Sequence, residues 1–227
     1  MTYEGLPSRL LGVREEIARR QAIGAWTHAV TIVAVTKGHG PEAVRAAVAA
    51  GLTDVGENRV QEAIGKQDAL GPLGVRWHLI GSLQRNKVRQ VVGRFELIHS
   101  VDRLELVAEL DKRVVPGRQA VLVEVNCSDE PQKGGVPLGE ARGLIDAIRA
   151  SSTLTFRGLM TMAALSDDER VQRRAFSRLR ELKDHLERDG ASGLELSMGM
   201  SGDYPVAIEE GATIVRLGTI LFGERLP

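Results

Sequence analysis

The stretch Thr31-Ile-Val-Ala-Val-Thr-Lys37 is followed closely by the helix-forming segment Pro41-Glu-Ala-Val44. An apolar run rich in β-branched residues predicts a buried strand, and proline at the start of the next segment is typical of the first turn of a helix. Lys37 is the only ionisable residue of the run and lies where strand gives way to helix. The same strand-then-helix unit recurs along the chain and decides the fold.

Eight strand-like runs alternate with helical patterns after an amphipathic opening segment at about residues 8–23. This alternation predicts one α/β domain over residues 1–227, a single (β/α)8 TIM-type barrel with an extra N-terminal helix. A doubly wound open sheet is the competing architecture, but it normally uses fewer strands at this length. The pattern contains seven helices between eight strands, one fewer than a (β/α)8 barrel has. The eighth helix, which closes the barrel, is therefore either missing or supplied by the N-terminal helix. The expected strands are 31–37, 54–58, 76–81, 97–102, 119–126, 155–162, 194–199 and 214–219, and the expected helices lie near 41–50, 59–69, 84–92, 103–113, 137–151, 167–189 and 205–210.

The composition disfavours several classes of partner. Lys plus Arg and Asp plus Glu are balanced at 30 each among 227 residues, so no overall field favours nucleic acid or an anionic membrane. Cys127 is the single cysteine, which excludes an intramolecular disulfide, and no Cys/His cluster has the spacing of metal ligands. The N-terminus lacks a signal-peptide pattern, and no run of about eighteen apolar residues occurs. We therefore expect a cytoplasmic protein without a bound metal.

The position of Lys37 indicates a site. In barrels of this kind the chemistry collects at the C-terminal ends of the strands, where Lys37 is expected. A lysine with reduced solvation can supply a neutral amine that forms a Schiff base with an aldehyde. The alternative is an ordinary solvated lysine at a strand end. The residues at the other strand ends distinguish a Schiff-base lysine from a solvated one.

A phosphate site is predicted by two glycine-containing segments near the C-terminus. Ser197-Met-Gly-Met-Ser201-Gly-Asp203 follows the seventh strand and Val215-Arg-Leu-Gly-Thr219 covers the eighth. Loops after these strands form the usual phosphate site of the fold, because glycines let backbone N–H groups approach and hydroxyls add donors. Each segment alone could be an ordinary turn, but two adjacent segments facing Lys37 favour an anion site.

Three further polar residues leave two interpretations open. Arg216 is the only strongly basic residue in an apolar strand, so it needs either an internal ion pair or a ligand. His78 alternates with apolar neighbours and is either a core histidine with its hydrogen bonds satisfied or a site residue. Lys133 lies in the segment Ser128-Asp-Glu-Pro-Gln-Lys-Gly, where a solvated lysine is the default.

Several motifs in one order resemble the pyridoxal-phosphate homeostasis protein family, over roughly residues 8–223. They are Ala34-Val-Thr-Lys37, Val55-Gly-Glu-Asn58, Trp77-His-Leu-Ile-Gly-Ser-Leu-Gln-Arg-Asn-Lys87, His99-Ser-Val-Asp102, Arg157-Gly-Leu-Met-Thr-Met162, Leu196-Ser-Met-Gly-Met-Ser201 and Val215-Arg-Leu-Gly-Thr219.

The resemblance implies a barrel similar to the N-terminal barrel of alanine racemase that binds pyridoxal 5′-phosphate (PLP) as its cofactor. Lys37 would then form the Schiff base, and Arg216 would face the pyridine nitrogen. Lys133 falls at a lysine that the family often has near the site, where it would be a secondary PLP lysine. Ser201, Gly218 and Thr219 would hold the phosphate, and Asn58, His78, Met160 and Ser197 would line the remaining wall.

The same resemblance favours a carrier over a catalyst. It implies a protein of vitamin B6 homeostasis without an established turnover, which would store PLP on Lys37 and release it to apo forms of PLP-dependent enzymes as a monomer. The alternative is a PLP-dependent amino-acid racemase or another lysine Schiff-base enzyme. A racemase needs bases on both faces of the substrate α-carbon, and with only Tyr3 and Tyr204 available we identify no obvious second base.

Overall fold

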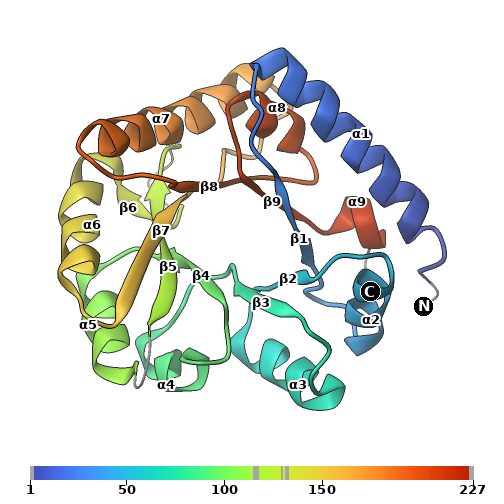
Figure 1. Ribbon diagram of the computed structural model, residues 1–227, viewed down its shortest axis with the longest axis horizontal. Helices are drawn as coiled ribbons and strands as arrows, with labels where there is room; N and C mark the ends of the chain where they lie inside the picture. The colour runs from blue at the N-terminus through green and yellow to red at the C-terminus, as the bar shows by residue number, and fades with distance from the viewer. Residues whose placement is uncertain (1–2, 115–117, 129, 131–132, 225–227) are drawn as a thin grey trace.

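Eight parallel strands close into a barrel in the computed structural model, which describes residues 3–114, 118–128, 130 and 133–224 (Figure 1). Neighbouring strands pair in the order β4-β3-β2-β1-β9-β8-β7-β5, and pairing of β4 with β5 closes the ring. A two-residue strand, β6, pairs in parallel with the last two residues of β5 at the rim. The strands are β1 (Thr31–Val35), β2 (Asp54–Glu57), β3 (Arg76–Leu79), β4 (Leu97–Val101), β5 (Gln119–Asn126), β6 (Val136–Pro137), β7 (Leu154–Met160), β8 (Glu195–Met200) and β9 (Ile214–Leu217).

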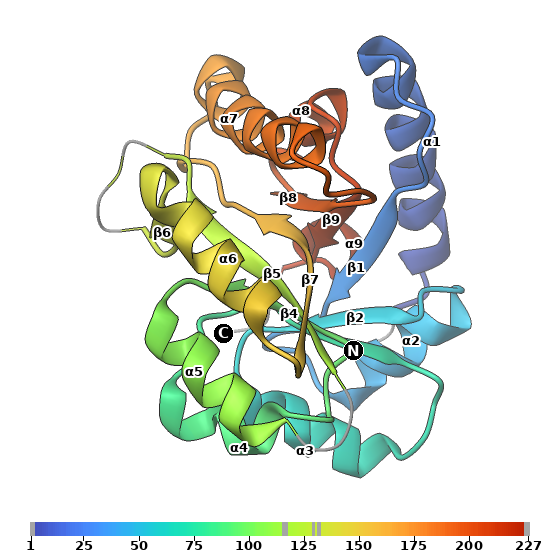
Figure 2. The ribbon, with the colours of Figure 1, turned by 60° about the vertical axis from the view of Figure 1, so that its left-hand side comes forward.

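Helices surround this barrel and follow the strands along the chain (Figures 1 and 2). Among the described helices, none combines the length and apolar character needed to cross a bilayer. The α-helices are α1 (Leu6–Gly24), α2 (Pro41–Ala49), α3 (Val60–Leu70), α4 (Val88–Val91), α5 (Leu104–Arg113), α6 (Ala141–Ala150), α7 (Glu169–Arg188), α8 (Tyr204–Glu209) and α9 (Thr219–Phe222), with 3-10 turns η1 (Arg85–Lys87) and η2 (Leu138–Glu140).

The N-terminal helix covers the outside of the barrel beside α9, the short helix that follows the last strand. Helix α1 packs against α8 and α9, and Figure 1 shows it along the outside of β1 and β9. Leu6, Leu10, Val13 and Ile17 form its buried stripe, at the three- and four-residue spacing of one helix face. The prediction of a barrel with an extra N-terminal helix is therefore confirmed, and α1 supplies the cover that was left open.

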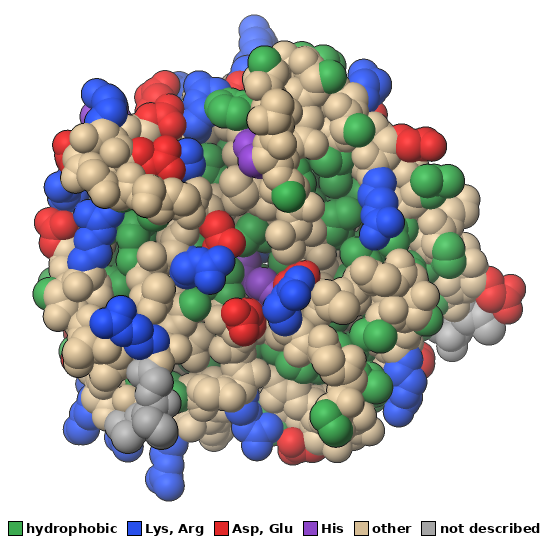
Figure 3. All heavy atoms as spheres, in the orientation of Figure 1, with side chains coloured by type: hydrophobic (Ala, Val, Ile, Leu, Met, Phe, Trp, Pro, Cys, Tyr) green, Lys and Arg blue, Asp and Glu red, His purple; other side chains and the backbone are tan. Residues whose placement is uncertain are grey.

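Alternation along each strand divides the buried residues into two layers. Residues on the outer face, such as Val121 and Val123 of β5, pack against the helices in one large apolar cluster, which we call the outer core. Residues on the inner face form a smaller apolar cluster inside the barrel: Val33, Leu97, Leu122, Met160 and Ile214. The inner face also carries buried polar side chains, and Figure 3 shows charged and histidine side chains gathered near the centre of the molecular face in view.

Most predicted strands end one to two residues later than the observed ones. Strand β1 ends at Val35 instead of Lys37, and β9 ends at Leu217 instead of Thr219. The difference has a physical reason, because the last residues of each run turn away from the ladder to build the rim. Those residues supply the site described next.

Candidate functional site

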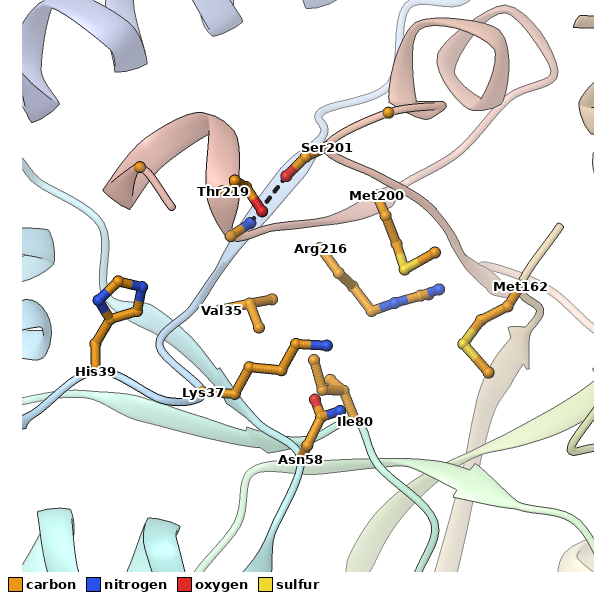
Figure 4. Close-up of a pocket in the computed structure, with 13 residues that line it drawn as sticks. Val35, Lys37, His39, Asn58, Ile80, Met162, Met200, Ser201, Arg216 and Thr219 are labelled. Carbon is orange, nitrogen blue, oxygen red and sulfur yellow. Dashed lines mark hydrogen bonds between the residues drawn. The ribbon is translucent and has the colours of Figure 1, made fainter. Parts of the chain in front are cut away.

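A cavity of about 230 Å³ opens at the C-terminal rim of the barrel. Lys37, Asn58, Ser201, Arg216, Gly218 and Thr219, all predicted as site residues, line it together (Figure 4). Residues from strands far apart in the sequence thus meet at one point. The other lining residues are Val35, His39, Ile80, Met162, Met200, Gly202 and Gly223.

Lys37 is half-buried at the end of β1, and its side chain extends into the cavity toward Asn58 and the guanidinium of Arg216 (Figure 4). The backbone on each side of it is held by α3. Lys66 Nζ donates to the carbonyl of Thr36 at 2.7 Å, and the Gly38 N–H donates to Glu62 at 2.6 Å. These two contacts fix the path of the chain through Lys37.

Lys66 was missed at the sequence level, although a signal existed. It is only 4% exposed and lies on the buried stripe of α3 with Val60 and Ala63, a position where an unpaired lysine would be costly. Its ammonium donates to Glu57 at 2.6 Å and to Glu62 at 2.9 Å. Burial raises the pKa of Glu57, and the hydrogen bond from Lys66 opposes that rise. A charged residue on the apolar stripe of a helix is the pattern that marks such a buried pair.

Arg216 is 4% exposed at the floor of the cavity. Its Nη1 donates to Ser197 Oγ at 2.6 Å and its Nη2 to the carbonyl of Thr161 at 2.9 Å. Burial lowers the pKa of Arg216 to about 10, and the charges of Asp203 and Glu124 oppose the shift, so it stays a cation at neutral pH. Its direct partners among the described residues are a hydroxyl and a carbonyl, not the carboxylate that the structural alternative required.

The two glycine-containing segments meet as expected for a phosphate site. Ser201 Oγ accepts hydrogen bonds from the N–H groups of Gly218 at 3.2 Å and Ile220 at 3.3 Å. A Cβ on Gly218 would lie 3.3 Å from the carbonyl oxygen of Val35, so the segment passes close to β1. Hydroxyls and backbone N–H groups therefore converge on one wall of the cavity.

Asn58 supplies an unsatisfied polar atom to the same cavity. Its Oδ1 is buried and has no hydrogen-bond partner among the described residues. A buried amide without a partner is costly unless a ligand or water completes its bonding. Asn58 Oδ1 is thus a polar atom that a hydrogen-bond donor on a ligand in this cavity could satisfy.

Three predicted wall residues do not reach the cavity. His78 and Ser197 lie buried inside the barrel, and Met160 belongs to the apolar inner cluster. The cavity is lined instead by Ile80 and Met162, which lie two residues further along the chain, just beyond the ends of β3 and β7. Side chains two residues apart share a face of a strand. The predicted residues therefore lie on the same face as the cavity-lining ones, but two residues further from the rim.

Lys133 lies on the rim segment between β5 and β6 and is not among the cavity-lining residues. Its Nζ donates to the carbonyl of Ala163 at 2.6 Å and pairs with Glu130 at 3.0 Å. These contacts hold its ammonium against neighbouring loops.

Comparison with known proteins accounts for this geometry. The model of the alanine racemase N-terminal domain matches residues 17–226. The pyridoxal phosphate homeostasis protein of Aquifex aeolicus is 42% identical over 221 residues, covering 96% of this chain and 97% of the relative. This chain belongs to the pyridoxal phosphate homeostasis protein family.

Solved structures agree with membership of this family. PipY of Synechococcus elongatus PCC7942, solved with PLP bound, superposes with a TM-score of 0.83 at 36% identity, covering 96% of this chain and all of that one. Alanine racemase of Clostridium difficile has a TM-score of 0.73 at 15% identity and covers 93% of this chain but 56% of its own. The racemase likeness, at 15% identity, concerns the fold alone, whereas the homeostasis protein of Aquifex aeolicus matches at 42% identity over nearly the whole length of both chains.

Proposed function

We propose that this protein binds pyridoxal 5′-phosphate covalently and reversibly at Lys37 and takes part in PLP homeostasis as a carrier. The observation that carries the proposal is that Lys37, Arg216 and the wall formed by Ser201, Gly218 and Thr219 line one common cavity at the rim. The family relationship supports it, because the relatives carry this name and PipY was solved with PLP bound.

The residues of the cavity fit the cofactor chemically. Bound PLP would supply three groups: an aldehyde, a pyridine nitrogen and a phosphate. The aldehyde condenses reversibly with a primary amine. The cavity offers one amine, at Lys37, and a wall of hydroxyl and N–H donors that suits the phosphate. The unpartnered buried oxygen of Asn58 is an independent sign that the cavity is built for a polar ligand.

Each residue has a distinct task in this proposal. Lys37 attacks in its neutral form, since only the unprotonated amine is a nucleophile. Arg216 donates hydrogen bonds and cannot accept them, so a ring nitrogen that faces it stays unprotonated. An unprotonated ring withdraws electrons weakly, which disfavours carbanion chemistry and suits storage.

The tyrosines support a carrier over a racemase. Tyr3 forms a hydrogen bond with His39 at 3.2 Å, and Tyr204 is 5% exposed at the start of α8. Neither is among the described residues that line the cavity. A tyrosine that could serve as the second base of a racemase is therefore absent from the described lining of this cavity.

The test is to add PLP to purified protein, record the visible spectrum, reduce with borohydride and map the modified peptide by mass spectrometry. We expect one adduct on Lys37, which Lys37→Ala abolishes. Lys133→Ala serves as the matched control and should leave the Lys37 adduct intact.

The outcomes separate the candidates. An undiminished adduct in Lys37→Ala would overturn the assignment of the lysine. Racemisation of free amino acids at the rate of an enzyme would replace the carrier by the racemase. Absence of any adduct in the unaltered protein would leave a phosphate-binding barrel with another ligand.

A further inference from the structure

A line of hydrogen-bonded polar side chains crosses the interior of the barrel and ends on Arg216. Asp54 Oδ1 lies 3.0 Å from His78 Nε2, and His78 Nδ1 lies 2.9 Å from His99 Nε2. His99 Nδ1 lies 2.9 Å from Ser197 Oγ, which accepts from Arg216. The side chains come from β2, β3, β4, β8 and β9, and all are buried. The cavity is reached only at the Arg216 end.

The Asp54 end of this line can only accept. Arg76 donates to both oxygens of Asp54, from Nε at 2.7 Å and from Nη2 at 2.5 Å. Hydrogen bonds from His78 and Arg76 oppose the desolvation of Asp54 and lower its pKa to about 2. The carboxylate is thus ionised at neutral pH, and His78 Nε2 must carry a hydrogen to bond with it.

The Arg216 end can only donate. Its Nη1–H occupies a lone pair of Ser197 Oγ, which leaves the serine hydroxyl hydrogen for His99 Nδ1. His99 then carries its hydrogen on Nε2 and donates it to His78 Nδ1. Complete burial lowers the pKa of His99 well below its ordinary value, and the charge of Arg216 acts in the same direction. A neutral His99 satisfies every bond in the line.

A cationic His78 would reverse the two inner bonds, but the charges argue against it. The guanidinium of Arg76 already compensates Asp54. A second cation on the same carboxylate would face Arg216 across the barrel with no further carboxylate in the line. Asp203 and Glu124 are the acidic groups whose charges act on Arg216, and neither belongs to the line.

We propose that Asp54, His78, His99 and Ser197 form a one-directional hydrogen-bond relay that positions Arg216 for the ligand ring. His78 and His99 act as positioning residues, an inference that rests on the proposed function because it concerns the group Arg216 presents to PLP. The relay and the carbonyl of Thr161 hold two nitrogens of the guanidinium, which fixes its plane. A substitution of Asp54, the first residue of β2, should therefore alter the position of the Arg216 guanidinium at the rim.

The first test uses the ligand-free protein and does not depend on PLP. Long-range 15N–1H NMR of the histidine rings at pH 7 reports which nitrogen carries hydrogen. We expect the Nε2–H form for both His78 and His99. A hydrogen on Nδ1 of His99 would overturn the direction of the relay.

The second test measures the coupling with pyridoxine 5′-phosphate, which lacks the aldehyde and so binds without Lys37. His99→Phe interrupts the relay and fills the same space, and Asp54→Asn removes its charge if the first variant fails to fold. We expect each to weaken binding about tenfold and to raise the ring-protonated fraction seen in the ultraviolet spectrum. Leu97→Met is the control, a volume-conserving change on the inner face of β4, the strand that carries His99. It should leave the affinity and the ring-protonated fraction unchanged.

The outcomes distinguish the relay from the proposed function. Variants that fold, as judged by circular dichroism, and keep the affinity and spectrum of the unaltered protein would refute the relay. Failure of the unaltered protein to bind pyridoxine 5′-phosphate would refute the proposed function, while the NMR result still decides the direction of the hydrogen bonds.

Discussion

The outer and inner faces of the same strands are built from different kinds of side chain. On β5, Val121 and Val123 face the helices, whereas Leu122 and Glu124 face the barrel interior. The outer face contributes to an apolar core with which the buried Lys66–Glu57 pair is associated, whereas the inner face combines apolar residues with several buried polar side chains, among them His78, His99, Glu124 and Arg216. The outer face holds the fold together, and the inner face accepts polar groups that only a site requires.

The largest effect is expected from a substitution in the outer core, which should lower stability without changing ligand binding. Phe176 of α7 is fully buried in the outer core, and Phe176→Ala should lower the free energy of unfolding by about 3–5 kcal/mol. The cavity is untouched, so the folded fraction should bind pyridoxine 5′-phosphate as before. Urea denaturation with and without the ligand measures both quantities. Weakened binding by fully folded protein would contradict the division of tasks between the faces.

The inner face should instead carry a pH-dependent cost. Burial and the charge of Asp102 raise the pKa of Glu124 to about 7, while Arg216 opposes the rise. The folded protein therefore keeps a proton that the unfolded chain has released, so stability falls as pH rises from about 4.5 to about 7. The cost is on the order of 3 kcal/mol at the upper end.

Glu124→Gln isolates this effect. We expect the difference in unfolding free energy between the variant and the parent to change across that window and to be constant above it. Urea titrations at closely spaced pH values supply the measurement. A difference that does not vary with pH would show that Glu124 ionises normally inside the barrel.

The smallest effect is expected at the rim, where the two faces end. Ser201→Ala removes the oxygen that accepts from Gly218 and Ile220, but the exposed rim lets water replace it. We expect the unfolding free energy to change by less than about 1 kcal/mol and affinity for inorganic phosphate to fall about fivefold. Calorimetry with phosphate checks the second value, and Ser177→Ala, at a partly exposed position of α7, is the control. An unchanged affinity would remove Ser201 from the anion wall.

Periodicity explains why the sequence predicted the barrel well and the site only in part. The alternation of Val33, Val35 and Lys37 follows the inner face of β1. Arg216 was predicted because it is the only strongly basic residue of an apolar strand, and Ser201 because it lies in a glycine-containing segment after a strand. Depth along the strand has no such periodic signal, which is why His78 was chosen where Ile80 lines the cavity. Pairwise contacts between distant strands, such as His78 with His99, depend on the register of closure, and no local pattern encodes it.

The grip of α3 on the residues beside Lys37 has a consequence for the speed of attachment. Lys66 and Glu62 hold the backbone at Thr36 and Gly38, so the amine is confined near the cavity before any aldehyde arrives. Confinement raises the effective molarity of the amine. The reaction of amine with aldehyde then becomes an effectively unimolecular step within one complex. Lys66 is not among the described residues that line the cavity, yet under the proposed function this entropic effect would let it influence how quickly Lys37 reacts with an aldehyde.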